Sequence, residues 1–343
     1  MIKLKGDERI LVILKGSIGD VARGIFVATE IKKKMPGVTL GWIVEPKSKD
    51  VIECVPAVDQ IFIFERKRGI KGIISAIREL RRFDPDITLD MQRHLKSGLF
   101  SFFSGASIRL GFNRKNSKEF NWIFQTHCTA FTPDTESKVN AYKKFLGSLG
   151  LANLQSIEEI EFGLKPKPMP EEAANLFSSS AKRVGIILGS TWQTKNWPTE
   201  GYIKLVRDLV SDSNLELFLL GDPSQVPVAS EITKSIQAPN LFDLTGKTKL
   251  SGAISIISRL DLLVGPDSGP GHIAAALSVP QVTLFGPTPE NRVAPYGGEN
   301  LRIRASVPCA PCLRRECPGL NNICMRLISA DSVAKKVRQV LAV

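Results

Sequence analysis

A glycine-rich segment in the last third of the chain carries residues that could bind phosphate. Leu262–Pro289 reads LLVGPDSGPGHIAAALSVPQVTLFGPTP: an apolar strand, a turn rich in glycine and proline, an Ala-rich helix from His272, and a second apolar strand. A glycine turn that opens a helix leaves backbone N–H groups unpaired, and such groups bind anions. Gly265–Gly271 therefore predicts a phosphate site.

Three other polar loops follow apolar runs that we predict as strands. They are Lys15–Asp20 (KGSIGD), Gly189–Lys195 (GSTWQTK) and Gly221–Gln225 (GDPSQ). In parallel α/β sheets, ligands bind beyond the carboxyl ends of the strands. We therefore expect these three loops and Gly265–His272 to line a binding site.

Four cysteines near the C-terminus have the spacing C-x2-C-x4-C-x6-C. Four thiols within sixteen residues could bind a structural zinc ion tetrahedrally, although the paired C-x2-C knuckles of strong zinc motifs are missing. Reduced, partly buried thiols are the alternative, as expected in the cytoplasm. The four residues are Cys309, Cys312, Cys317 and Cys324.

The charge of the chain is uneven. The net charge is +12, and residues 1–170 carry 28 Lys and Arg against 19 Asp and Glu, whereas residues 171–343 carry 18 against 15. A basic first half suits nucleic acid, anionic lipid or a phosphorylated glycan, although a merely soluble basic surface would have the same composition. Candidate contact residues are Arg66, Lys67, Arg68, Arg78, Arg81, Arg82, Arg114 and Lys115.

The two halves of the chain each show alternating strand and helix patterns. Residues 9–14 (RILVIL) form a near-continuous apolar run, as in a strand buried on both faces of a parallel sheet. Further strands are expected at 38–44, 59–64, 86–90, 108–111, 183–188 and 216–220. Helices are expected at 21–34, 69–83, 95–103, 138–149, 199–211, 226–237, 250–259 and 331–341. Residues 113–135 fit neither pattern, and we expect an irregular insertion that lines or covers a cleft.

Residues 164–170 (LKPKPMP) separate the two halves. Alternating prolines cannot join a helix or a central strand, so we interpret this stretch as a linker. We therefore predict two α/β domains, residues 1–163 and residues 171–343. No apolar run reaches the roughly 18 residues of a membrane span, and the N-terminus resembles a first strand more than a signal peptide, so we expect a cytoplasmic protein.

The motifs resemble those of bacterial heptosyltransferases, glycosyltransferase family 9. The matching residues are Gly19-Asp20, Gly189-Ser-Thr with Lys195-x-Trp197-Pro198, Asp267-Ser-Gly-x-x-His272, and Phe285-Gly-Pro-Thr288; Cys309-x-x-Cys312 recurs in some members. The resemblance spans nearly the whole chain. It implies a GT-B fold, in which two facing Rossmann-like domains with parallel sheets enclose a cleft. The acceptor would bind to residues 1–163 and the sugar nucleotide to residues 171–343.

The resemblance also implies the reaction. The enzyme would transfer heptose from ADP-heptose to the inner core of lipopolysaccharide, with inversion at the anomeric carbon. Its partners would be the donor and a lipid A–core oligosaccharide, reached by transient contact with the anionic inner face of the inner membrane, and not nucleic acid. No cofactor is expected, because no Asp-x-Asp motif for a divalent cation lies in the loops.

Two residues take catalytic roles by this resemblance. Asp20 would accept the proton of the acceptor hydroxyl, although from its position alone it could merely cap the following helix. Lys195 would balance the charge of the departing diphosphate, unless it is only a solvated loop lysine.

The remaining expected site residues bind the donor. Asp267 would organise its loop by accepting backbone N–H bonds, and His272 would contact phosphate or hold the loop. The family binds the adenosine ribose with an acidic residue where this chain has Gln225, although Asp222 could substitute. Hydroxyl and amide groups for the phosphates would come from Ser190, Thr191, Ser268, Gly269 and Gly271.

Two other functions fit parts of the sequence. The same fold could serve an epimerase or a transferase of another nucleotide sugar. A nucleic-acid-binding protein would explain the basic surface and the cysteines, but the sequence lacks a recognition helix, an aromatic stacking platform and zinc-finger spacing.

Overall fold

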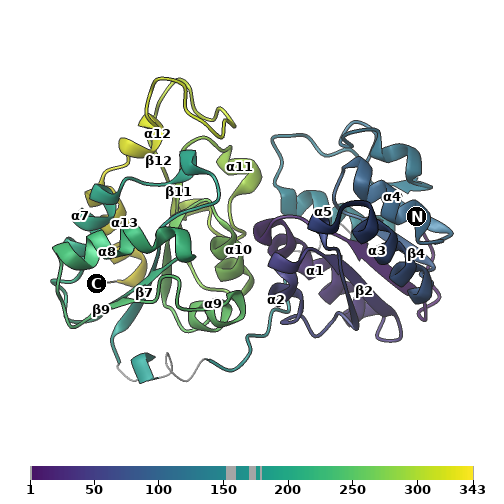
Figure 1. Cartoon of the computed structure of the whole chain (residues 1–343), viewed down its shortest axis with the longest axis horizontal. Coiled ribbons are helices and arrows are strands. Elements are labelled where there is room, and N and C mark those ends of the chain that lie inside the picture. The colour runs from purple at the N-terminus through teal and green to yellow at the C-terminus, as the bar shows by residue number, and fades with distance from the viewer. Residues whose placement is uncertain (1, 152–159, 170–174, 178–179, 343) are drawn as a thin grey trace. The chain divides into compact units, whose positions relative to one another are not determined.

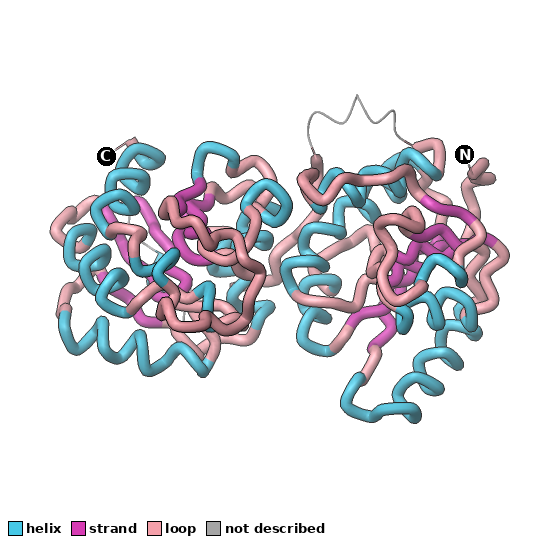
Figure 2. Tube along the Cα trace, turned by 90° about the horizontal axis from the view of Figure 1, so that it is seen from above, coloured by secondary structure: helices cyan, strands magenta, loops and turns pink. Residues whose placement is uncertain are grey.

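The computed structural model describes residues 2–151, 160–169, 175–177 and 180–342. The chain divides into two compact units, Met1–Lys165 and Pro166–Val343, and the division falls within residues 164–170. Each unit contains one six-stranded sheet, and the paired strands of both sheets are parallel. In each unit, helices cover the strands (Figures 1 and 2). The predicted α/β class is confirmed.

The first unit alternates strands and helices along the chain. Its strands are β1 (Arg9–Ile13), β2 (Thr39–Val44), β3 (Gln60–Ile63), β4 (Ile87–Asp90), β5 (Ile108–Gly111) and β6 (His127–Cys128). Its α-helices are α1 (Ile18–Lys34), α2 (Lys49–Ile52), α3 (Gly69–Phe83), α4 (Leu95–Phe103) and α5 (Lys138–Ser148). Single 3-10 turns are η1 (Pro46–Ser48), η2 (Arg66–Arg68) and η3 (Asn121–Phe124).

Strand β1 lies at the centre of this unit and is buried on both faces, as its apolar run predicts. Leu11 and Ile13 pack into a cluster with Phe83 of α3 and Phe100 of α4. The neighbouring strand β2 has Gly41 opposite Leu11, where an added Cβ would lie 2.9 Å from the Phe83 ring. Close packing between α3 and the sheet therefore fixes the position of β1 and of the loop that follows it.

The second unit repeats the pattern. Its strands are β7 (Lys182–Ile187), β8 (Leu215–Leu220), β9 (Leu241–Asp243), β10 (Leu262–Pro266), β11 (Gln281–Phe285) and β12 (Arg302–Arg304). Its α-helices are α7 (Thr199–Leu209), α8 (Val226–Ser235), α9 (Leu250–Ile257), α10 (Gly269–Ala276), α11 (Glu290–Val293), α12 (Ile323–Arg326) and α13 (Ala330–Leu341). Short 3-10 turns are η4 (Asn175–Phe177), η5 (Gln193–Lys195), η6 (Pro223–Gln225) and η7 (Glu299–Leu301).

Helices α7, α8 and α13 form a layer on one face of the second sheet, and α9 and α10 lie on the other (Figure 1). The first layer buries one core cluster, to which β7 contributes Val184 and Ile186 and α13 contributes Val333 and Val337. On the opposite face of β8, Phe218 stacks on Phe242. The central strands are thus enclosed on both sides, which leaves their carboxyl ends as the place for polar loops.

The structure differs from the predicted elements at several points. Strands β9 and β12 lack a sequence prediction, and β6 lies inside residues 113–135, which we expected to be irregular. Helices α1 and α10 each begin three residues earlier than expected, so the glycines of both motifs lie in first helical turns. Among the described residues, none of the helices combines the length and the hydropathy that a membrane span requires.

Candidate active site

Both sheets have the same strand order, and this order locates the candidate site. The first runs β3-β2-β1-β4-β5-β6 and the second β9-β8-β7-β10-β11-β12. In such doubly wound sheets the connections change direction between the first and fourth strands, and ligands bind at the carboxyl ends there. The loops after β1 and β4, and those after β7 and β10, are therefore the expected ligand-binding loops of the two units.

Asp20 lies in the first turn of α1, three residues after the N-cap. Ser17 is the N-cap: its Oγ accepts a hydrogen bond from the Asp20 N–H at 3.3 Å. The Ser17 hydroxyl lies 3.0 Å from Asp20 Oδ2 and donates to it. The alternative that Asp20 itself caps the helix is therefore wrong, and its carboxylate is available for other contacts.

Two cations contact the same oxygen of Asp20. Lys138 Nζ, at the start of α5, donates to Oδ1 at 2.8 Å, and Arg23 Nη1 donates to Oδ1 at 3.1 Å. Burial by itself would raise the pKa of Asp20, but the charges of Lys138 and Arg23 and the Ser17 hydroxyl hold it well below its usual range. The carboxylate is therefore ionised and can accept a proton.

A second pair of buried charges lies across the β1–β4 switch point. Lys15 follows β1, is only 5% exposed, and has its Nζ 4.5 Å from the centre of the Phe100 ring. Asp90, the last residue of β4, is fully buried and accepts a hydrogen bond from Asn121 Nδ2 at 2.7 Å. Burial lowers the pKa of Lys15 to about 8, although the attraction of Asp90 opposes this shift. Burial also raises the pKa of Asp90. The sequence suggested Lys15 only as part of a loop and did not suggest Asp90.

In the second unit, Lys195 and Asp267 meet at the β7–β10 switch point. Lys195 ends η5 and Asp267 directly follows β10. Lys195 Nζ donates to Asp267 Oδ2 at 2.7 Å, and the two side chains are 15% and 6% exposed. Two residues that lie 72 positions apart in sequence thus form one partly buried ion pair.

Asp267 is surrounded by groups that stabilise its negative charge. Thr288 Oγ1, after β11, donates to Asp267 Oδ2 at 3.0 Å, and His272 Nε2 lies 3.8 Å from Oδ1. Burial would raise the pKa of Asp267, but His272 and Lys195 hold it well below its usual range. Asp267 therefore orients Lys195 and the buried His272, which is only 2% exposed. The expectation that the Asp267 carboxylate accepts backbone N–H bonds is wrong, because among the described residues its hydrogen-bond donors are the side chains of Lys195 and Thr288.

The loop after β7 is held in place by two polar contacts. The Ser190 N–H donates to Asn196 Oδ1 at 2.7 Å, and the Ser190 hydroxyl donates to the Asp267 carbonyl oxygen at 3.3 Å. Ser190 therefore joins Lys195 beside Asp267, whereas Thr191 is exposed. Trp197, which the sequence places in the same motif, is 4% exposed and belongs to the core cluster.

The glycine segment after β10 forms a helix start. Ser268 is the N-cap of α10, and Gly269 and Gly271 lie in the first turn of this helix. The prediction that both glycines belong to a turn before the helix is therefore wrong. The Ser268 Oγ is buried and has no hydrogen-bond partner within the described part of the chain. Gly271 packs against Gln281, because an added Cβ would lie 2.1 Å from its Oε1. The first-turn N–H groups have no intrahelical acceptors, which is the arrangement that binds phosphate.

Gln225 lies beside the end of β7, and its side-chain oxygen already accepts a hydrogen bond within the chain. Added Cβ atoms on Gly189 and Gly221 would each lie 3.0 Å from its side chain, so Gln225 fits between two glycines. Its Oε1 accepts from the Asp222 N–H at 2.9 Å, and Asp222 in turn caps η6 through the Ser224 N–H at 2.7 Å. Both candidate ribose contacts therefore also form this capping box.

The C-terminal segment contacts the β7 loop, which the sequence did not indicate. Thr194 Oγ1 donates to the Arg314 carbonyl oxygen at 2.8 Å. Trp192 has two cations on its ring: Arg315 Cζ at 4.9 Å and Lys195 Nζ at 4.8 Å from the centroid. Arg315 therefore adds positive charge next to Lys195.

The four cysteines do not form a metal site in the structure. Cys309 and Cys312 are exposed, Cys317 is half-buried and Cys324 is buried, and all four are free thiols. Throughout the residues that the structure describes, no group of three or more His, Cys, Asp or Glu side chains is arranged to hold a metal ion. The structure thus gives no support to the zinc hypothesis.

Two Rossmann-like units with this strand order, each with polar residues at its switch point, define the GT-B fold class. A family model described as "Glycosyltransferase family 9 (heptosyltransferase)" matches residues 73–322. The chain belongs to this family, as its motifs predict, and is therefore a glycosyltransferase.

Similar proteins cover most of the chain. The lipopolysaccharide core heptosyltransferase OpsX of Haemophilus influenzae is 25% identical over 295 residues, which are 85% of this chain and 83% of that protein. Lipopolysaccharide heptosyltransferase 1 of Pseudomonas aeruginosa is 24% identical over 322 residues, 90% and 87% of the two chains. The structure of Escherichia coli heptosyltransferase WaaC with ADP has the same fold, with a TM-score of 0.77 at 20% identity over 97% of this chain and 99% of that one.

Proposed function

We propose that this chain is an inverting heptosyltransferase that moves heptose from ADP-heptose to the inner core of lipopolysaccharide. The observation that carries the proposal is the Lys195–Asp267 ion pair at the β7–β10 switch point, next to the first turn of α10. Family membership supports heptose as the sugar. The E. coli relative with bound ADP supports an adenine nucleotide as the carrier.

In this proposal, residues 171–343 bind the donor. Lys195, the Ser190 and Thr191 hydroxyls and the N–H groups of Ser268, Gly269 and Gly271 bind the diphosphate. Asp267 does not contact phosphate; it orients Lys195, which keeps further N–H donors for the ligand. The burial of His272 supports a role in holding the loop. Gln225 binds the adenosine ribose through its amide N–H.

Residues 1–163 bind the acceptor, and Asp20 is the base. Asp20 takes the proton of the acceptor hydroxyl as the hydroxyl oxygen bonds to the anomeric carbon of heptose. The bond from that carbon to the phosphate oxygen breaks, and its electron pair leaves with ADP. Lys195 stabilises the negative charge that develops on the diphosphate. A single displacement of this kind inverts the anomeric carbon.

The acceptor sets the location of the enzyme. Lipid A–core oligosaccharide is anchored in the inner membrane, so the protein would work in the cytoplasm and touch the inner leaflet transiently. The 28 Lys and Arg against 19 Asp and Glu in residues 1–170 support an acidic acceptor and an anionic membrane.

Replacing Asp20 tests the proposal. Asp20→Asn should lower kcat by roughly 10²–10⁴-fold, the usual contribution of a general base, and leave the Kd for ADP-heptose nearly unchanged. Transfer to heptose-deficient lipopolysaccharide and calorimetric binding measure the two quantities. Asp7→Asn, at an exposed carboxylate of the same unit, is the matched control. Near-normal turnover by Asp20→Asn would refute the base assignment.

The nucleotide can be tested separately. ADP-heptose should raise the unfolding temperature of the wild type, and UDP- and GDP-sugars at the same concentration should not, because only a bound ligand stabilises the folded state. Equal shifts with UDP- or GDP-sugars would favour a transferase or epimerase of another nucleotide sugar.

A further inference from the structure

Helix α3 exposes two isoleucines on its solvent side. Ile70 is 75% exposed and Ile74 is 45% exposed, and they are four positions apart, so they lie one turn apart on the same face. The buried face of the helix is formed by other residues, among them Leu80 and Phe83. The two isoleucines are therefore not needed for the core of the unit.

Exposed cations surround these isoleucines. Lys71 lies between them, Arg78 is one turn beyond Ile74, and Arg66 and Lys67 form the preceding turn η2; all four are exposed. None of these four cations forms a salt bridge with another described residue. Between positions 66 and 82 the sequence has seven Lys and Arg and one acid, Glu79. We call Arg66, Lys67, Ile70, Lys71, Ile74 and Arg78 the α3 stripe.

The α3 stripe begins at the edge of the sheet that also carries Asp20. Turn η2 and α3 follow the carboxyl end of β3, as Asp20 follows the carboxyl end of the parallel strand β1. Phe120, 72% exposed, lies at this edge too, because the neighbouring Glu119 accepts a hydrogen bond from the Leu95 N–H, just after β4. Exposed apolar side chains thus occur at two places along one edge.

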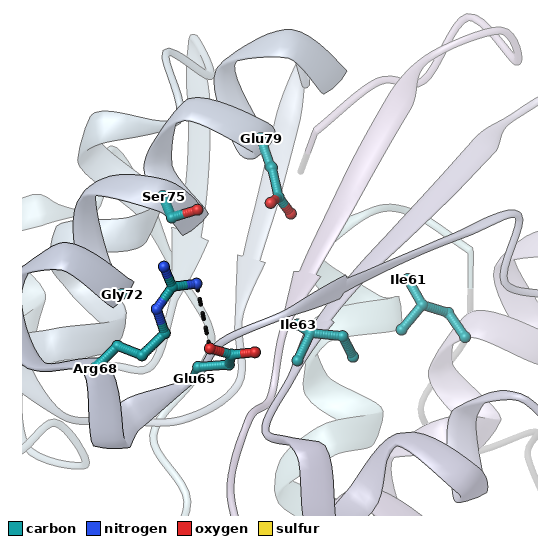
Figure 3. A pocket seen from close by; sticks show the side chains of 7 residues that line it. All are labelled: Ile61, Ile63, Glu65, Arg68, Gly72, Ser75 and Glu79. Carbon is teal, nitrogen blue, oxygen red and sulfur yellow. Dashed lines mark hydrogen bonds and ion pairs between the residues drawn. The ribbon is translucent and has the colours of Figure 1, made fainter.

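The neighbouring pocket is a less suitable place for an anion. This cavity has a volume of about 250 Å³. Ile61 and Ile63 from β3 lie on one side of it and α3 on the other (Figure 3). Its one arginine, Arg68, is paired with Glu65 at 3.3 Å, and Glu79 adds a second carboxylate. Anionic groups would be attracted to the stripe outside the pocket.

We infer that the α3 stripe is the surface by which this protein docks on an anionic phospholipid membrane. Isoleucines that stand out of a basic helix face fit a bilayer interface, where apolar side chains enter the acyl boundary and cations contact lipid phosphates. Nucleic acid would use the cations but would gain nothing from Ile70 and Ile74. The inference rests on the proposed function, because docking along this edge would bring a membrane-anchored acceptor to Asp20.

Vesicle sedimentation of the full-length protein tests the docking surface. The wild type should bind phosphatidylglycerol-containing vesicles, more weakly at higher salt, and should bind pure phosphatidylcholine at least tenfold more weakly. Ile70→Ser/Ile74→Ser and Lys67→Gln/Lys71→Gln/Arg78→Gln should each reduce binding more than tenfold. Matched controls in the second unit, Leu327→Ser (58% exposed) and Lys204→Gln/Arg207→Gln/Lys234→Gln, should stay within twofold of wild type.

Three results would overturn the inference. The first is that either stripe variant binds vesicles as well as the wild type does. The second is that the control variants lose as much vesicle binding as the stripe variants. The third is that the wild type binds duplex DNA as tightly as vesicles and that the stripe substitutions weaken both kinds of binding equally. Transfer assays separate docking from chemistry. Stripe variants should transfer heptose at least tenfold more slowly to acceptor embedded in vesicles, and at the wild-type rate to de-acylated acceptor.

The two proposals fail in different ways. If stripe variants use the embedded acceptor as the wild type does, docking is wrong and heptose transfer stands. If the wild type transfers to neither acceptor but binds vesicles through the stripe, docking stands and the proposed function is wrong.

Discussion

The carboxylate of Asp20 is controlled by residues from two distant parts of the first unit. Arg23 is one turn further along the same helix, whereas Lys138 lies 118 positions later in the chain. Both donate to Oδ1, so the ionised form of Asp20 is stabilised before any acceptor binds. A carboxylate held in this way is charged at neutral pH, and its strength as the proposed base falls as the two cations stabilise the ionised form.

Removing one of these cations should change the pH dependence of the reaction. Lys138→Met should raise the pKa of Asp20, because an opposite charge 2.8 Å away is lost. The acidic limb of the kcat/KM profile, where Asp20 becomes protonated, should then move to higher pH by about 1–3 units. Because the pKa of Asp20 lies well below its usual range, initial rates from pH 7 down to the most acidic pH at which the chain stays folded measure this limb.

A lysine on the same helix provides the control. Lys144 contacts Glu136 Oε2 at 3.1 Å and the Phe131 carbonyl oxygen at 2.8 Å, so Lys144→Met should leave the acidic limb in place. If Lys138→Met behaves as Lys144→Met does, Asp20 is not the group that limits the rate at low pH.

Lys15 should make stability depend on pH in the alkaline range. Its pKa is about 8 in the folded chain and 10.5 in the unfolded chain, so between these values the unfolded chain binds more protons. The free energy of unfolding therefore rises with pH across this window, and the cost of burying the charged form is largest below pH 8. Between pH 7.5 and 10.5, the free energy of unfolding of the wild type should rise on the order of 1–3 kcal/mol more than that of Lys15→Met.

Urea unfolding at several pH values measures this difference. Lys47 is an exposed lysine that contacts Glu45. The free energy of unfolding of Lys47→Met should therefore change with pH as that of the wild type does. If the difference in the free energy of unfolding between Lys15→Met and the wild type stays constant with pH, folding does not lower the pKa of Lys15.

At the scale of elements, strands β7 and β10 approach closely where the site forms. An added Cβ on Gly265 would lie 2.7 Å from Ile187 Cβ and 3.1 Å from its carbonyl oxygen. Gly265→Ala should therefore force the strands apart and destabilise the protein by about 1–3 kcal/mol. Because Lys195 and Asp267 follow these strands, ADP binding should weaken as well.

Thermal unfolding and ADP titration measure both effects. Gly298→Ala is the control, because its Cβ would come no nearer than 3.5 Å to the Pro295 carbonyl oxygen and its φ is −103°. If Gly265→Ala is as stable as Gly298→Ala, the close strand contact has no energetic role.

Sequence patterns located long elements well and short edge elements poorly. Helices α3 and α4 have the predicted bounds, because their apolar periodicity is strong and turn residues flank them. Strands β9 and β12 are three residues each and only half-buried or exposed, so they show no such pattern. The starts of α1 and α10 were predicted late, since Gly19, Gly269 and Gly271 were interpreted as turn residues although each lies in a first helical turn.

The candidate site was predictable in part for a related reason. Loops at strand ends can be found from sequence, which placed Lys195, Asp267 and Ser190 in neighbouring loops. Partners from distant elements carry no local signal, so Lys138 was not predicted as a contact of Asp20. Thr288 was visible in a motif, but only the fold shows that it donates to Asp267.

At the scale of the whole molecule, the two units share one strand order but carry different charges at their switch points. The first presents a carboxylate held by two cations, and the second presents a lysine oriented by a carboxylate. This difference supports a division of labour in which one unit accepts a proton and the other receives an anion. Each role follows from local chemistry within its own unit.

This division predicts where ADP alone should protect the chain. Hydrogen exchange should slow in residues 188–196, 221–225 and 266–272, because bound ligand suppresses local opening where it makes contacts. Residues 15–23 and Lys138 should exchange at the ligand-free rate, since the proposed function assigns the acceptor, and not ADP, to the first unit. Mass spectrometry of peptides with and without saturating ADP measures this pattern, and Lys195→Met should lose most of the protection in the second unit. Protection confined to residues 15–23 would instead place the nucleotide in the first unit and reverse the assigned roles.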